Sequence, residues 1–324
     1  MRRIARRTFV KGIAASTLFS PQIARAQDWP TRPVRFIVHL AAGGGLDFIA
    51  RLVGEHLSRS LGQQVFIENR TGGAGGTIGI DAGIKATPDG YNFLVCNDNV
   101  ASSPHVLRLN VDFLKDLAPV SLLGRQPQVL AVHPSLEVKS VAELVATARK
   151  LSSLGCATSG VGSNQHVLME WFAKAADIKL EHVPYRGAGQ AINDLIAGHV
   201  KFAILGPTAP LPHAQAGTIR LLAQSGDARS PSMPDLPTLQ EVGYQGVTLE
   251  SWFAVFAPLG TPAAAIAQLN AACDKALADK ATRDALFKAA TEPVGGDTER
   301  LGKLARADSE KYARIVKEVN IKLN

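Results

Sequence analysis

The sequence predicts an α/β protein with mainly parallel sheets. Short apolar runs of strand length alternate along the chain with segments whose apolar residues recur at helical spacing. Residues 34–40 form a nearly continuous apolar run, which is typical of a strand buried on both faces of a parallel sheet. The chain has 324 residues and is 46% hydrophobic, so it can bury a large core, and its length favours two domains over one.

The first strand leads through a glycine-rich turn into a helix. Ile49, Leu52, Val53 and Leu57 recur at helical spacing after this turn. Further strands are expected at residues 65–67, 93–96, 130–132, 155–158, 180–183, 202–205 and 221–223, with helices between them. The last long helix is expected to begin at Asp297 or Thr298.

The turn between the first strand and helix, residues 41–47, is the strongest candidate for a binding site. The first N–H groups of a helix have no intrahelical partner, and the helix dipole adds partial positive charge at the same end. An incoming carboxylate or phosphate satisfies both. We therefore expect the following residues of the turn to bind an anion: Ala42, Gly43, Gly44, Gly45 and Asp47.

Two alternatives stay open for this turn. No lysine followed by Ser or Thr closes it, and its glycines lack the G-x-G-x-x-G spacing, so the motif alone names no ligand. The glycines could serve only to turn the chain tightly, and Asp47 could serve only to cap the helix.

Small polar residues also follow several other predicted strands. They are Asn97 and Asn99 after the third strand, Ser159, Gly160, Ser163 and Asn164 after the strand at 155–158, and Thr208 after the strand at 202–205. Because ligands of open α/β sheets bind beyond the carboxyl ends of strands, we expect these residues to share a polar cleft. Ser163 is an equally good helix cap, and Arg186, after another strand, could form a surface ion pair.

The N-terminus predicts export. Arg6-Arg7-Thr8-Phe9-Val10-Lys11 is a twin-arginine pattern, a short apolar segment follows at 13–19, and Ala24-Arg25-Ala26 is a small-residue cleavage site. Cleavage after Ala26 predicts a mature chain that begins at Gln27 and resides in the periplasm. The apolar segment is shorter than the roughly 20 residues that span a bilayer.

The basic character of the chain lies in this leader. The whole sequence carries 35 Lys and Arg against 28 Asp and Glu, and residues 1–26 hold six of the basic residues and no acidic one. The mature chain is therefore nearly neutral, so the electrostatic argument for nucleic acid or an anionic membrane as partner is lost.

Cysteine and motif patterns point away from disulfide, metal and enzyme chemistry. Cys96, Cys156 and Cys273 are odd in number and far apart, so we expect no disulfide framework, no metal site and no cofactor. No G-x-S-x-G, H-E-x-x-H or P-loop motif occurs, and we expect no enzymatic activity.

In combination, the motifs resemble the solute-binding proteins of the tripartite tricarboxylate transporter system, the Bug-type extracytoplasmic receptors. The resemblance runs from about Trp29 to the C-terminus. Besides residues 41–47, it rests on Trp29-Pro30-Thr31-Arg32-Pro33-Val34, Val65-Phe66-Ile67-Glu68-Asn69-Arg70, Gly75-Gly76-Thr77-Ile78-Gly79, Pro88-Asp89-Gly90-Tyr91, His182-Val183-Pro184-Tyr185-Arg186-Gly187, Leu236-Pro237-Thr238, Ser251-Trp252-Phe253 and Glu292-Pro293-Val294-Gly295-Gly296.

This resemblance implies a two-lobed fold of the type II periplasmic binding protein kind, with two crossing segments. One lobe would comprise residues 27–125 and 253–324, and the other residues 126–252. It further implies that the turn at 41–47 holds a ligand carboxylate through backbone groups and ordered waters, that a second loop at 159–165 holds the rest of the ligand, and that a monomeric receptor delivers it to a membrane permease.

The chain departs from the family pattern near the carboxylate end. Leu40 stands where an aromatic residue is common, Leu46 stands where a small hydroxyl residue is common, and residues 206–208 replace a more polar stretch. These changes suit a more apolar acid, so the expected ligand is a dicarboxylate or an aromatic acid. A receptor that signals to a sensor and an exported hydrolase or isomerase are the alternatives.

Overall fold

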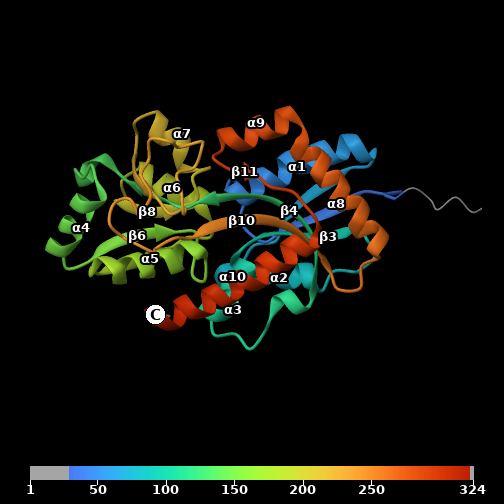
Figure 1. Ribbon diagram of the computed structural model, residues 1–324, viewed down its shortest axis with the longest axis horizontal. Coiled ribbons are helices and arrows are strands. Elements are labelled where there is room, and N and C mark those ends of the chain that lie inside the picture. Colours follow the sequence, from blue (N-terminus) through green and yellow to red (C-terminus); the bar gives the residue numbers. More distant parts are fainter. Residues whose placement is uncertain (1–28, 322–324) are drawn as a thin grey trace, which may run out of the picture.

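The computed structural model describes residues 29–321, which form two α/β parts lying side by side (Figure 1). The predicted leader, residues 1–26, falls outside the described residues. Within residues 29–321, no helix is long and apolar enough to cross a membrane.

The first part is built on a six-stranded sheet in the order β11-β4-β10-β3-β1-β2. Its strands are β1 (Val34–Val38), β2 (Val65–Asn69), β3 (Asn92–Asn97), β4 (Leu117–Pro127), β10 (Glu250–Pro258) and β11 (Glu292–Pro293). Its helices are α1 (Gly45–Leu61), α2 (Thr77–Ile84), α3 (Asn99–Val106), α8 (Ala263–Ala278), α9 (Lys280–Lys288) and α10 (Thr298–Val319), with 3-10 turns η1 (Ala74–Gly76) and η2 (Phe113–Lys115).

The second part is built on a five-stranded sheet in the order β7-β6-β8-β5-β9. Its strands are β5 (Val129–Val132), β6 (Leu154–Thr158), β7 (Leu180–Pro184), β8 (Phe202–Leu205) and β9 (Arg220–Gln224). Its helices are α4 (Val141–Lys150), α5 (Asn164–Ala176), α6 (Ala188–Ile196) and α7 (Pro210–Gln215), with the 3-10 turn η3 (Pro134–Leu136).

Every strand expected from the sequence is present, and the last helix begins at Thr298 with Asp297 as its cap. The sheets, however, are mixed rather than mainly parallel. β1 pairs in parallel with β2 and β3, and β6 with β7 and β8. β10 is antiparallel to β3 and β4, and β5 is antiparallel to β8 and β9. The parallel pairs belong to strand–helix–strand units, whereas the antiparallel pairs involve the strands next to the crossings between the sheets.

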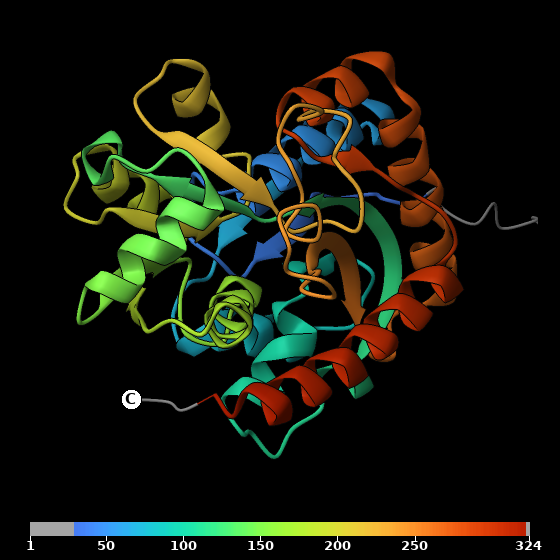
Figure 2. The ribbon, with the colours of Figure 1, turned by 60° about the vertical axis from the view of Figure 1, so that its left-hand side comes forward.

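The chain passes from one sheet to the other at two neighbouring places. β4 ends at Pro127 and β5 begins at Val129, so the first crossing lies at Gln128. The chain returns between β9 and β10, and Glu250 of β10 pairs with Pro127 of β4. The two crossings therefore lie side by side and form a joint, with β4 and β10 running along it (Figure 2).

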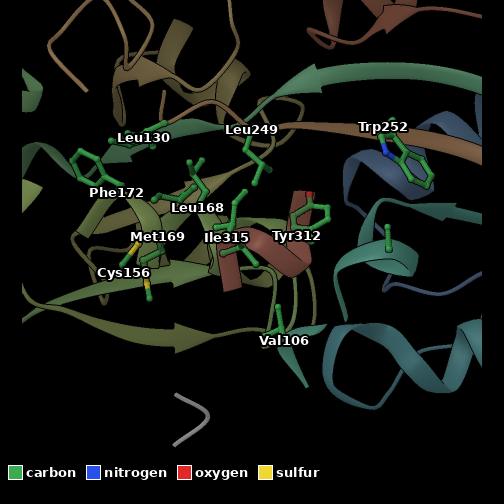
Figure 3. Packing of buried hydrophobic residues seen from close by; sticks show 14 of the residues in the cluster. Val106, Leu130, Cys156, Leu168, Met169, Phe172, Leu249, Trp252, Tyr312 and Ile315 are labelled. Carbon is green, nitrogen blue, oxygen red and sulfur yellow. The ribbon is translucent and has the colours of Figure 1, made fainter. Parts of the chain in front are cut away.

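Both parts contribute to one hydrophobic cluster. Phe172 of α5 in the second part packs in the same cluster as Tyr312 and Ile315 of α10, the C-terminal helix (Figure 3). The Lys174 ammonium also donates a hydrogen bond to the carbonyl of Glu318 (2.6 Å). Helix α10 thus packs against both parts of the chain.

The three cysteines are free, and all three are buried. Burial raises the pKa of each thiol above its ordinary value. These cysteines act as small apolar core residues.

Candidate ligand-binding cleft

Helix α1 begins with backbone N–H groups that have no partner in the part of the chain that the structure describes. Its N-cap is Gly44, which has no side chain to accept a hydrogen bond from the first turn. The first helical bond runs from the N–H of Phe48 to the carbonyl of Gly44 (3.0 Å), so the N–H groups of Gly45 and Leu46 are free. Together with the positive end of the helix dipole, these groups form a site for an anion.

Asp47 stabilises the turn before α1 from within. Its buried carboxylate accepts hydrogen bonds from the N–H of Gly43 (3.2 Å), from Arg51 Nε (3.0 Å) and from Asn69 Nδ2 (3.0 Å). Burial raises the pKa of Asp47, but the hydrogen bonds from Arg51, Asn69 and Gly43 outweigh it and hold the pKa below its ordinary value. Asp47 is therefore ionised and occupies the N–H of Gly43, which lies just outside the helix.

The N-terminus of α1 faces a small hollow of about 40 Å³ between the two parts, here called the inner hollow. Four of the residues expected from the sequence line it: Gly44, Gly45, Asn97 and Ser159. The other lining residues are Leu40, Ala41, Leu46, Gln126, Gln165, Gly187, Ala188, Gly206, Ser251 and Phe253. All of these side chains are neutral at pH 7, so the inner hollow can hold an anion only through hydrogen-bond donors.

Asn97 lines the inner hollow, and its amide is held by the oxygen end. Its Oδ1 atom accepts a hydrogen bond from the backbone N–H of Asn99 (3.2 Å), a group that can only donate, and lies 2.9 Å from His39 Nε2. Burial lowers the pKa of His39 to about 4, so its ring is neutral and can donate from Nε2. Within residues 29–321, Asn97 Nδ2 has no protein acceptor, so it is available to a ligand. Asn99 is buried beside Asn97 and donates from its own Nδ2 to the carbonyl of Gly75 (3.3 Å).

The serine hydroxyls of the loop before α5 form hydrogen bonds to other groups of the protein. Ser163 caps α5 by accepting from the N–H of His166 (3.2 Å), and its hydroxyl donates to the carbonyl of Gly160 (2.7 Å). Ser159 lines the inner hollow, but its hydroxyl donates to Gln165 Oε1 (2.6 Å). The helix-cap interpretation of Ser163 thus agrees with the structure.

Asn164 connects the two parts through a buried carboxylate. Its Nδ2 atom donates to Asp98 Oδ1 (3.1 Å). Asp98 also accepts from Ser251 Oγ (2.5 Å) and from the hydroxyl of Tyr312. Burial raises the pKa of Asp98 to about 7, although these hydrogen bonds oppose the shift. Another hydrogen bond between the parts runs from the Ser102 hydroxyl to the Gly162 carbonyl (3.0 Å).

A larger hollow of about 460 Å³, here called the outer hollow, shares Leu40 and Ser159 with the inner one. It is also lined by Gly160, by the glycine-rich loop at residues 71–76 and by Arg186. Arg186 is exposed, and within residues 29–321 its guanidinium makes no ion pair. A ligand could therefore extend from the neutral inner hollow toward a cationic rim.

Eight of the twelve predicted residues do not line the inner hollow. Five of them are described above: Asp47, Asn99, Gly160, Ser163 and Asn164. The other three are Ala42, Gly43 and Thr208. Ala42 and Gly43 line a different, more open hollow beside Gly189 and Asn193. Thr208 lies behind the inner hollow, where its hydroxyl is 3.0 Å from Gln126 Oε1 and 3.1 Å from the carbonyl of Ala289.

Sequence reasoning missed Gln126, Gln165 and Phe253 as lining residues. Gln126 lies near the end of β4 and Phe253 lies on β10, and neither strand is among those predicted from the sequence. Gln165 ends the second predicted binding loop, 159–165, and lines the inner hollow together with Ser159.

A cavity of about 360 Å³ lies on another side of the joint. It is lined by β4, β10 and α10 and contains both acidic and basic side chains, including Arg125, Glu250, Arg300 and Lys311. Ser251 borders both this cavity and the inner hollow.

Two α/β parts, two neighbouring crossings and a polar cleft between the parts define a two-lobed solute-binding protein. The family model described as "Tripartite tricarboxylate transporter family receptor" matches residues 49–321, and the chain belongs to this family. The resemblance inferred from the motifs is thereby confirmed.

Three solved structures are similar over nearly the whole chain. The periplasmic binding protein BugD is 28% identical with a TM-score of 0.86, and covers 91% of this chain and 99% of its own. Rpa4515 of R. palustris, solved with adipate, is 32% identical with a TM-score of 0.87, at 90% and 99% coverage. MatC (Rpa3494) of Rhodopseudomonas palustris, solved with bound malate, is 28% identical with a TM-score of 0.84, at 89% and 100% coverage.

Proposed function

We propose that this receptor captures a small organic carboxylate, a dicarboxylate or an aromatic acid, between its two lobes and delivers it to a tripartite tricarboxylate-type permease. The observation that carries the proposal is the uncapped N-terminus of α1, whose free N–H groups face a hollow lined only by neutral side chains. An anion placed there gains donors without competing with a buried carboxylate.

The lining also favours an acid with an apolar middle. Leu40, Leu46 and Phe253 line the inner hollow beside the donors, and the two leucines stand where the family commonly has an aromatic and a hydroxyl residue. Adipate, bound to the neighbour Rpa4515, combines two carboxylates with an apolar chain, and malate, bound to MatC, is a shorter dicarboxylate. A second carboxylate could reach Arg186 through the outer hollow.

In this proposal the lobes comprise residues 27–125 with 253–324, and residues 126–252. The exported chain would begin at Gln27, reside in the periplasm, act as a monomer and catalyse no reaction. Binding would shift an existing equilibrium between open and closed lobes toward the closed state.

A thermal-shift panel on the chain from Gln27 tests the ligand class. The panel contains adipate, malate, citrate, benzoate, aspartate and the neutral compound nicotinamide. An acid at 100 times its dissociation constant adds about 2.7 kcal/mol of stability, enough to raise the melting midpoint by a few degrees. A rise with one class of acid supports the proposal, whereas a response to nicotinamide alone contradicts it.

Delivery to the permease needs a separate measurement. Uptake of the acid identified by the panel should require both the receptor gene and the permease genes. Uptake that is unchanged without the permease would contradict delivery while leaving acid binding intact.

A further inference from the structure

Gln126 is the only carboxamide of β4 that lines the inner hollow, and it is nearly completely buried. It lies at the joint, three residues before the first strand of the second sheet begins at Val129. Residues of both lobes can therefore contact the side chain of Gln126.

Two hydroxyl groups hold the carbonyl end of this amide. Gln126 Oε1 accepts a hydrogen bond from Thr291 Oγ1 (3.1 Å), which precedes β11 in the first part. It also lies 3.0 Å from Thr208 Oγ1, which follows β8 in the second part and shares its single proton between Gln126 Oε1 and the carbonyl of Ala289 (3.1 Å). Both threonine side chains contact the same oxygen, so the Nε2 group is the end left over. Within residues 29–321, no hydrogen bond runs from this Nε2 group to a protein acceptor.

The free Nε2 group lies beside the N-terminus of α1. A Cβ atom built on Gly45 would lie 3.4 Å from Gln126 Nε2, and one built on Gly206 would lie only 2.4 Å from it. A side chain at Gly206 would thus displace the amide, which explains why the smallest residue suits that position. The amide, the first N–H groups of α1 and Asn97 Nδ2 all border one hollow that contains no charged side chain.

We propose that Gln126 is a specificity-determining residue that donates a hydrogen bond from Nε2 to an oxygen of the bound acid, next to the carboxylate site at α1. This inference rests on the proposed function. No acidic side chain lines the inner hollow to accept hydrogen bonds from the donors around Gln126. A ligand must therefore present an oxygen acceptor there. An ammonium group at the same place would face donors and lose its hydration without a counter-charge. The receptor therefore selects plain organic acids over the matching amino acids.

Titration calorimetry with adipate and malate, and with their amino counterparts 2-aminoadipate and aspartate, tests the inference. The wild-type chain from Gln27 should bind at least one plain acid at least tenfold more tightly than its amino counterpart. Gln126→Leu should weaken binding of that acid about 10- to 100-fold, which corresponds to one lost hydrogen bond to a charged group. Gln64→Leu, on the exposed connection before β2, is the matched control and should bind as the wild type does.

Gln126→Glu adds a readout that a purely structural role would not change. At pH 7 its carboxylate would repel the acid and abolish binding, and at pH 5 protonation of the buried carboxyl group should restore part of the affinity relative to the wild type. Gln126→Leu should show no such recovery. Gly206→Ala, which displaces the amide without removing it, should weaken binding of the same acid.

The outcomes separate the two proposals. A wild-type chain that binds neither adipate nor malate overturns the proposed ligand class and this inference with it. A wild-type chain that binds while Gln126→Leu stays within twofold overturns only the role of Gln126, as does full binding by Gln126→Glu at pH 7. If Gln126→Leu fails to fold by its melting curve, the nearly isosteric Gln126→Glu decides the question.

Discussion

The two turns that precede α1 and α5 share a local design but differ in how their helix N-termini are satisfied. Each follows a buried strand and contains glycine, and each borders the cleft. The N-cap of α1 is Gly44, which leaves N–H groups free, whereas the N-cap of α5 is Ser163, whose hydroxyl accepts from the first turn. This difference implies that a glycine-rich turn can bind an anion only where no group of the protein accepts from the first N–H groups of the helix.

The largest effect is expected from a variant that supplies the missing hydrogen-bond acceptor at the N-terminus of α1. Gly44→Asp would place a fixed carboxylate at the free N–H groups and should weaken acid binding more than 100-fold, because it occupies and repels the site of the anion. Calorimetry with the best acid of the panel measures the loss.

Gly44→Ala is the matched control for this variant. The φ angle of Gly44 is −94°, and an added Cβ would approach nothing closer than 3.9 Å, so alanine fits without strain. Binding within threefold of the wild type is expected for Gly44→Ala. Equal affinity of the Asp and Ala variants would show that the N-terminus of α1 does not hold the acid.

The turn before α5 is connected to the first lobe by a hydrogen bond to the buried carboxylate of Asp98. The titration of Asp98 is expected to have the next largest effect, on the free energy of unfolding. The pKa of Asp98 is about 7 in the folded protein against an ordinary 3.8, so the folded state holds the proton more tightly. Stability conferred by protonated Asp98 is therefore present at low pH and is lost as pH rises toward 7.

Comparison with Asp98→Asn isolates this effect. Unfolding in urea should show the wild type losing about 1–2 kcal/mol relative to Asp98→Asn between pH 5 and pH 7. The buried histidines His39, His166 and His182, whose pKa values are lowered by burial, titrate in both proteins and cancel in the difference. A difference that stays constant or grows with pH would contradict the assignment.

The next prediction tests whether the carboxylate of Asp47 stabilises the turn before α1. Asp47→Ala removes the acceptor for Gly43, Arg51 and Asn69 and should cost about 1–3 kcal/mol of stability, with acid affinity reduced less than tenfold. Asp81→Ala, which removes an exposed carboxylate paired with Lys85, is the control and should change stability by less than about 0.5 kcal/mol. Loss of affinity at unchanged stability would instead make Asp47 a ligand residue.

The smallest effect is expected from the cap of α5. Ser163→Ala should cost about 1 kcal/mol of unfolding free energy and leave acid affinity unchanged, because the hydroxyl is used within its own loop. Ser140→Ala, at the N-cap of α4 and away from the cleft, should cost a similar amount. A selective loss of affinity in Ser163→Ala would mean that the α5 turn also binds the acid directly.

The turn before α1 could be predicted from sequence because its determinants are local. An apolar strand, three glycines and an amphipathic helix specify the uncapped N-terminus without reference to the rest of the fold. The position of Ser163 as a helix cap likewise follows from a short-range pattern.

Gln126 and the carboxylate of Asp98 could not be predicted in this way. Gln126 meets Thr208 and Thr291 only because β4 and β10 carry the chain across the joint, and these contacts join residues far apart in sequence. The same long strands made the sheets mixed, since their pairing partners follow from the crossings and not from a local pattern.

The most direct test of the central claim is an NMR titration of the ¹⁵N-glycine-labelled chain with the best acid of the panel. If the free N–H groups of α1 hold the carboxylate, the amide proton of Gly45 should move downfield and saturate with the calorimetric affinity, while those of Gly160 and Gly162 move less. A larger shift at Gly160 or Gly162, with Gly45 unchanged, would contradict the assignment of the anion site to α1.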